Sequence, residues 1–229
     1  MQIHIIDKRR QLPRHPNKKY RRRTREAIKQ IIIHHSGTKE GSPESFARYH
    51  VNHHGWPGIG YHYVIDKKGR VFHCQSQEEI TYHTANHNQQ SIGVCLIGDF
   101  TKESLTDFQK KAVLAFIRSL SKERKIPIAN VRGHNEYKGH RSSLCPGISM
   151  EGFRGQLRKK RLLPLLKRGA RGEEVKFLQQ ALVKKGFDPK GIDGMFGPLT
   201  EKAVVDFQRA NNLFIDGIVG SNTWSSLGL

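Results

Sequence analysis

Apolar residues fall into short strand-like runs in the first two thirds of the chain and into helical spacing beyond them. The runs rich in Ile, Val and Tyr cover residues 28–35, 59–66, 70–75 and 91–97, a pattern typical of buried strands. Lys-Lys-Gly joins the second run to the third and predicts a hairpin. We also expect residues 130–132 to return to the same sheet.

Helices are predicted between these strands. Ser42 and Pro43 have the character of an N-cap and a first helical residue, and this helix should end at Gly55. Thr106 opens a second helix that should end before Pro127. Its expected apolar face consists of Phe108, Ala112, Val113, Phe116, Ile117 and Leu120. The alternation predicts an α/β domain in which helices flank a central mixed β-sheet.

The pattern changes after residue 157. Residues 158–171 combine charge, Pro and Gly, and we expect them to be a linker. Segments 193–200 and 216–223 both read Asp-Gly-x-x-Gly-x-x-Thr and both lead into a helical pattern. The apolar positions of the expected helices are Val175, Leu178, Leu182, Ala203, Val204, Phe207, Trp224 and Leu227. This predicts a small all-α domain of three helices at residues 172–229, with the character of a binding module.

The N-terminal segment of the chain is strongly basic. The 229 residues have a formal net charge of +20. Residues 8–29 alone carry eleven Lys and Arg side chains against Glu26, interrupted by prolines. We expect residues 1–27 to form an extended basic arm, which suits nucleic acid, a membrane surface or another polyanion. A solvated arm without a partner is the alternative.

The cysteines and the hydropathy argue against a disulfide-rich secreted protein and against a membrane-spanning protein. Three scattered cysteines imply no disulfide framework, and we expect Cys74 and Cys95, which lie in strand runs, to be buried and reduced. The N-terminus has no apolar stretch of a secretory signal. No apolar run approaches the ~20 residues of a membrane span. We therefore expect a soluble protein that is synthesised in the cytoplasm.

Candidate metal ligands lie about a hundred residues apart. His34 follows three isoleucines, and His134 and Cys145 stand in GHNEYKGHRSSLCPG. Two imidazoles and a thiolate suit tetrahedral zinc and leave a fourth position for water, as in catalytic sites. His140 is an alternative to His134 as ligand. Cys145 as a nucleophile is a rival interpretation, but it leaves His34 without a role.

Four motifs carry a resemblance to a known family. IIIHHSGT, GIGYHYVIDKKGRV, HNQQSIGVCLIGDF and GH…CPG follow one another across residues 28–147. They resemble the type-2 N-acetylmuramoyl-L-alanine amidases, which include phage lysozyme-like amidases and animal peptidoglycan recognition proteins. The tail looks like the three-helix peptidoglycan-binding domain of cell-wall hydrolases. The resemblance implies a zinc amidase domain at residues 28–157 of a phage endolysin; a bacterial autolysin and a non-catalytic peptidoglycan-binding protein are the alternatives.

The resemblance also assigns site residues. It implies three zinc ligands, His34, His134 and Cys145. Tyr61 matches a tyrosine near the metal, and His83 falls where related amidases keep a histidine that lines the substrate groove. Ser143 stands two positions before the cysteine, where relatives often hold Lys or Thr, and its hydroxyl can donate to an oxyanion. The gap from His134 to Cys145 is longer than the usual family spacing. His35 should face away, because side chains alternate along a strand.

The implied reaction is hydrolysis of the amide between N-acetylmuramic acid and L-alanine, with one zinc ion that polarises the carbonyl and activates water. The implied partners are peptidoglycan and anionic wall polymers such as teichoic acids. Nucleic acid is not expected, because no nucleic-acid-binding motif accompanies the charge. We expect a monomer without a signal peptide or membrane span, which acts at the bacterial cell wall after release.

Overall fold

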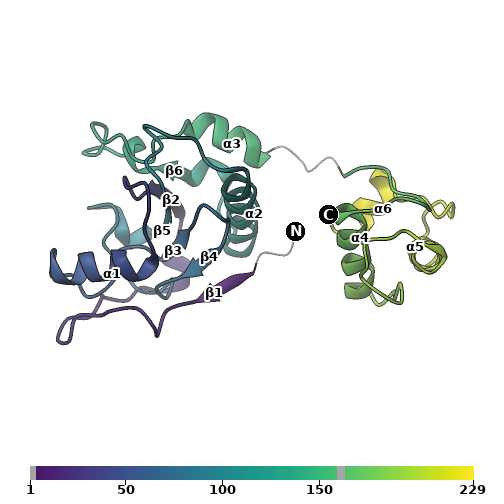
Figure 1. The fold of residues 1–229 in the computed structure, drawn as a ribbon, viewed down its shortest axis with the longest axis horizontal. Helices are drawn as coiled ribbons and strands as arrows, with labels where there is room; N and C mark the ends of the chain where they lie inside the picture. The colour runs from purple at the N-terminus through teal and green to yellow at the C-terminus, as the bar shows by residue number, and fades with distance from the viewer. Residues whose placement is uncertain (1–3, 159–162) are drawn as a thin grey trace. The chain divides into compact units, whose positions relative to one another are not determined.

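The chain divides near residue 159 into two compact units, each with its own hydrophobic core (Figure 1). The computed structural model describes residues 4–158 and 163–229. Residues 1–3 of the expected arm and residues 159–162 of the expected linker lie outside the described residues. Among the helices of the described ranges, none has the length and apolar character needed to cross a bilayer.

A six-stranded mixed sheet organises the larger unit. Its strands are β1 (Ile5–Asp7), β2 (Gln30–His35), β3 (Tyr63–Ile65), β4 (Val71–His73), β5 (Ser91–Leu96) and β6 (Val131–Gly133). They lie in the order β1-β4-β3-β5-β2-β6. The expected hairpin is present, since β3 and β4 pair antiparallel, and every other pair in the sheet is parallel. The predicted mixed sheet is thus confirmed.

Helices cover the sheet, and the first two begin where the sequence indicated, whereas the third was not predicted. They are α1 (Pro43–Asn52), α2 (Asp107–Arg124) and α3 (Met150–Arg158), with short 3-10 helices at Arg25–Ala27, Asn88–Gln90, Ile128–Asn130 and His134–Glu136. Ser42 forms a capping box with Ser45, and the Thr106 hydroxyl accepts a hydrogen bond from the Gln109 amide. α2 ends at Arg124 because Lys125 adopts the left-handed conformation.

The predicted apolar face of α2 is wrong at one position. Phe108 is 70% exposed, whereas its neighbour Gln109 is buried. The Gln109 amide donates to the carbonyls of Ile65 and Ile97 at the ends of β3 and β5. Helical spacing alone favoured the phenylalanine, but a polar side chain takes the inward place because it satisfies carbonyls at the end of the sheet.

The two faces of the sheet have separate cores. Ile31 and Ile33 of β2 pack with α2 and α3 on one face. Cys95 of β5 lies on the other, in a cluster that includes Ala47 of α1 and Leu12 of the N-terminal segment. Figure 1 shows α1 and α2 on opposite sides of the sheet. Cys74 and Cys95 are buried and free, as predicted.

The N-terminal segment, which was expected to be an extended basic arm, packs on the larger unit from residue 4 onward. β1 extends the sheet by pairing with β4. Tyr20 is buried, and its hydroxyl contacts the carbonyls of Gly58 and Ile59. The buried Arg23 guanidinium donates twice to the Gln77 carbonyl. The apolar residues between the charges anchor the segment.

The smaller unit contains the three predicted helices, α4 (Glu173–Lys184), α5 (Pro198–Ala210) and α6 (Ser221–Ser226). Its two Asp-Gly segments are built alike. The Gln179 side chain bonds Asp193 and the Gly194 amide, and Gln208 bonds Asp216 and the Gly217 amide in the same way. Residues 163–171 pack on this unit, with Leu166 buried against Val219, so this described part of the expected linker belongs to the smaller unit.

Candidate active site

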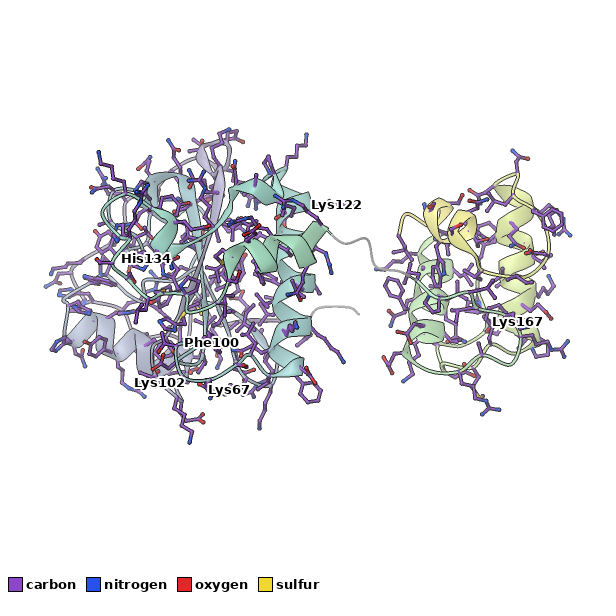
Figure 2. All side chains as sticks on the ribbon, turned by 90° about the horizontal axis from the view of Figure 1, so that it is seen from above. Lys67, Phe100, Lys102, Lys122, His134 and Lys167 are labelled. Atoms are coloured by element: carbon purple, nitrogen blue, oxygen red, sulfur yellow. The ribbon has the colours of Figure 1, made fainter. Side chains whose placement is uncertain are left out.

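His34, His134 and Cys145 meet at one edge of the sheet, where the atoms that they offer as ligands all lie within 4.8 Å of one another. His34 stands near the end of β2, and His134 directly follows the neighbouring parallel strand β6. The carboxyl ends of parallel neighbours lie at the same edge, and the following loop returns Cys145 to them. In Figure 2, His134 lies in the larger unit, on the side away from Lys122 of α2.

The spacing of these atoms fits zinc. Cys145 Sγ lies 3.6 Å from His34 Nδ1. A tetrahedral ion with Zn–N of ~2.05 Å and Zn–S of ~2.3 Å places its nitrogen and sulfur ligands about 3.6 Å apart. Two imidazoles and one thiolate are also ligands that zinc prefers. The three residues therefore form a candidate zinc site with a fourth position for water.

A histidine behind His34 fixes its tautomer. The Ser91 hydroxyl donates to the His87 carbonyl at 2.7 Å, so it accepts from His83 Nε2 at 3.4 Å. His83 Nδ1 is then an acceptor, and it lies 3.1 Å from His34 Nε2. The His34 proton therefore resides on Nε2, and the lone pair of Nδ1 faces Cys145.

This arrangement changes the interpretation of His83. The family resemblance implied that His83 lines the substrate groove, but the side chain is only 8% exposed and its ring packs against that of His34. Gly93 of β5 lies directly against the His83 ring. The placement supports a role in holding His34 in place of direct contact with substrate.

Burial sets the protonation states of the site. It lowers the pKa of His34, with His83 as a further cause, and lowers the pKa of His134 to about 4. Both imidazoles are thus neutral near pH 7, which metal ligation requires. Burial raises the pKa of the Cys145 thiol to about 11, although the His35 amide donates to Sγ and opposes this. Metal binding therefore has to release the thiol proton.

The remaining predicted residues lie around the three ligands. The Tyr61 ring centroid is 5.4 Å from that of His34, and burial, Cys95 and Cys145 raise its pKa well above the usual value, so the phenol stays protonated. The Ser143 hydroxyl accepts from the Cys145 amide at 3.2 Å and keeps its own proton for another partner. The Tyr61 phenol is also hydrogen-bonded to the Cys95 side chain. The catalytic roles of Tyr61 and Ser143 remain predictions.

His35 is directed away from the ligands, as strand alternation predicts. Its Nδ1 accepts a hydrogen bond from the Phe100 amide at 3.2 Å. Asp99 lies 3.9 Å from the same nitrogen. The residue therefore stabilises the turn after β5 instead of sharing the ion.

Sequence reasoning missed an aromatic wall beside Tyr61. His50 of α1 lies between Tyr61, 5.6 Å away by ring centroids, and Trp56, on which it stacks at 4.9 Å. Trp56 in turn meets Tyr82 edge-on at 5.7 Å. The signal was the density of His and aromatic residues between positions 49 and 56. These rings pack on one another beside Tyr61, with His50 buried among them.

Comparisons with known proteins agree with this geometry. The model of the N-acetylmuramoyl-L-alanine amidase family matches residues 24–148, and the model of a peptidoglycan binding domain matches residues 171–227. The first match spans more than half of the chain. The chain therefore belongs to the N-acetylmuramoyl-L-alanine amidase family.

Individual relatives are distant. The Escherichia phage T7 endolysin is 28% identical over 132 residues, which are 56% of this chain and 85% of that protein. The N-acetylmuramoyl-L-alanine amidase of Sus scrofa is 35% identical over 69 residues, 30% of this chain but only 12% of its own length. Among solved structures, an endolysin of a Thermus scotoductus bacteriophage aligns with a TM-score of 0.57 and 25% identity, covering 69% of this chain and 100% of that one.

Proposed function

We propose that the protein is a zinc-dependent endolysin that cleaves the amide bond between N-acetylmuramic acid and L-alanine in peptidoglycan. The observation that carries the proposal is the grouping of His34, His134 and Cys145 at zinc spacing in a chain of the amidase family. The endolysins among its relatives and the peptidoglycan-binding match of the tail support the same substrate.

The residues present suit this chemistry. When bound, zinc supplies a Lewis acid for the scissile carbonyl and lowers the pKa of water. His34, His134 and Cys145 would hold it. The protonated Tyr61 phenol donates to the oxyanion that forms on the carbonyl, and Ser143 is a second donor. The wall formed by Trp56 and His50 orients the substrate and keeps water from one side of Tyr61.

Digestion of purified peptidoglycan tests the proposal. The protein is incubated with and without a chelator, next to Cys145→Ser, and the fragments are identified by mass. We expect stem peptides with a free L-alanine amine, lost with chelator and in the variant, together with about one zinc per chain by elemental analysis. New reducing sugar ends would show that another bond is cut. Wall binding without any cleavage would make the protein a recognition module.

We further infer that the basic N-terminal segment binds anionic wall polymers. Two adjoining hollows of 260 and 560 Å³ share Arg14, Arg22 and Glu79 in their lining. The other basic residues around them are Arg9, Arg10, His15, Lys18 and Lys19. Tyr20 is the aromatic residue of these linings, and it is buried, so bases find no stacking platform there. A polymer of sugar or polyol phosphates suits this surface better than nucleic acid.

Charge reversal tests this inference. Arg10→Glu combined with Lys19→Glu changes two exposed residues of the surface, and Lys110→Glu with Lys111→Glu on α2 makes the same charge change elsewhere. We expect only the first pair to weaken sedimentation with teichoic-acid-bearing walls and to reduce its salt dependence. Equal binding to walls stripped of teichoic acid would refute the inference. A gel shift with DNA at physiological salt reports on the nucleic-acid alternative.

A further inference from the structure

We infer that His140 is a positioning residue of the metal site, which holds His134 in the tautomer and orientation that ligation requires. The inference rests on the zinc dependence proposed above. It concerns a residue from the stretch between His134 and Cys145. The sequence offered His140 as an alternative to His134 as zinc ligand. The structure instead places the His140 ring behind that of His134.

The two ring nitrogens of His140 contact His134 on one side and the Ala85 carbonyl on the other. Its Nδ1 lies 2.9 Å from Nε2 of His134, and its Nε2 lies 3.1 Å from the carbonyl oxygen of Ala85. The rings of His134 and His140 are 4.5 Å apart by their centroids. His140 is therefore behind His134 and is not among the grouped ligand atoms, which belong to His34, His134 and Cys145.

These contacts determine where the protons sit. A carbonyl oxygen only accepts, so His140 Nε2 carries a proton and donates to Ala85. In neutral His140 the other nitrogen, Nδ1, is an acceptor, and His134 Nε2 must donate to it. The lone pair of His134 is then on Nδ1 and available to the metal. Ligating histidines generally donate their second N–H in this way, which orients the ring and raises its basicity.

The loop holds His140 in this position. The His140 amide donates to the Tyr137 carbonyl at 3.0 Å, and the Ser143 amide donates to the His140 carbonyl at 2.9 Å. Tyr137 is buried, bonds to Gln30 of β2 and packs on the His87 ring at 4.4 Å. These contacts fix the backbone at His140, from which its ring reaches His134.

The two imidazole ligands are thus supported alike. His83 accepts from His34 Nε2, and His140 accepts from His134 Nε2. Both arrangements leave Nδ1 free for the ion. The two supporting histidines differ in burial. His83 lies in the interior under β5, whereas His140 is half-buried in a surface loop. The His140 side chain thereby links His134 to the carbonyl of Ala85.

Zinc affinity tests the role without reference to activity. The affinities of wild type, His140→Ala, His140→Gln and the loop control Arg141→Ala are measured by competition with a chromogenic chelator. We expect His140→Ala to weaken zinc binding by about 10–100-fold. His140→Gln should recover most of this loss, because its amide oxygen accepts from His134 and its NH₂ donates to Ala85. Arg141→Ala should bind as wild type does.

The outcomes separate this inference from the proposed function. If wild type binds no zinc, the zinc proposal itself fails. If wild type binds zinc and His140→Ala binds it equally well, His140 has no positioning role. If Gln is as poor as Ala, while His134→Ala keeps its zinc, His140 is a ligand and the assignment is overturned.

A measurement on the unchanged protein covers the case in which a variant does not fold. Nitrogen-15 NMR of the imidazoles in the zinc-loaded wild type reports which nitrogen of His134 carries the proton. We expect the proton on Nε2 and the metal on Nδ1. The reverse assignment would contradict the inference.

Discussion

At the scale of single residues, the site depends on buried imidazoles kept neutral and oriented by other imidazoles. His34 and His134 each have a lowered pKa because they are removed from water. Each also has its Nε2 within hydrogen-bond distance of another histidine. The sequence indicated which residues gather, but their tautomers follow only from partners such as Ser91 and Ala85.

Tyr61→Phe tests the phenol as an oxyanion donor. The ring and its packing against His34 and His50 remain, so the variant should fold and bind zinc as wild type does. We expect kcat for a soluble muropeptide to fall by about 10²–10³-fold, the usual cost of one such donor. Hydrolysis kinetics and zinc titration together check this. An unchanged kcat would remove Tyr61 from the mechanism.

A pH dependence of stability follows from His50. Burial lowers its pKa to about 4, and its Nδ1 accepts from the Gly60 amide at 3.1 Å. Between pH 4 and 6.5 the unfolded chain therefore binds more protons than the folded one, and stability falls as the pH drops through this window, with a slope of about 1.4 kcal/mol per pH unit for one histidine. Urea denaturation from pH 7 to 4.5 should show a shallower slope for His50→Gln but not for the exposed His53→Gln. Equal slopes in wild type and His50→Gln would contradict this.

At the scale of elements, the site is built where β2, β5 and β6 lie side by side. β2 carries His34, β6 leads into His134, and Gly93 of β5 leaves room for the His83 ring. The sequence predicted each of these strands separately. Their order, which brings β6 next to β2, depends on tertiary pairing.

Gly93→Ala tests the close approach of β5 to His83. A Cβ at this position would lie 2.6 Å from His83 Cγ, so the ring must shift. We expect the larger unit to lose about 1–3 kcal/mol of stability, as for overpacking in other cores, and zinc affinity to fall because His34 loses its support. Gly155→Ala in α3, where nothing lies within 4 Å, is the matched control. Denaturation and zinc competition check both, and wild-type zinc affinity in Gly93→Ala would argue against the role of His83.

At the scale of the molecule, the candidate zinc site and the match to a binding domain fall in two units with separate cores. The larger unit holds the candidate zinc site, and the smaller one matches a peptidoglycan binding domain. The smaller unit repeats its glutamine-centred network twice, around Gln179 and Gln208. These buried amides stabilise the turns of the smaller unit.

Truncation after residue 158 tests this division. The core of the larger unit is complete without the smaller unit, so the fragment should hydrolyse a soluble muropeptide with wild-type kcat/KM. We expect it to lose most of its affinity for intact walls, while a fragment of residues 160–229 binds walls without cutting them. Sedimentation with purified walls and muropeptide kinetics measure both. A fragment that binds walls as tightly as the full chain would show that the smaller unit is dispensable for binding.

The sequence by itself determined most of the helices and strands, though not β1 and α3, and it determined the family and the identity of the candidate ligands, because periodicity, caps and motif spacing are local properties. Ser42, Thr106 and the Asp-Gly segments show this most clearly. Only the tertiary structure decided that the basic segment packs on the sheet, that Gln109 replaces Phe108 in the interior, and that His83 and His140 stand behind the ligands. These features depend on which distant atoms satisfy one another's hydrogen bonds once water is excluded, and no local pattern encodes such pairings.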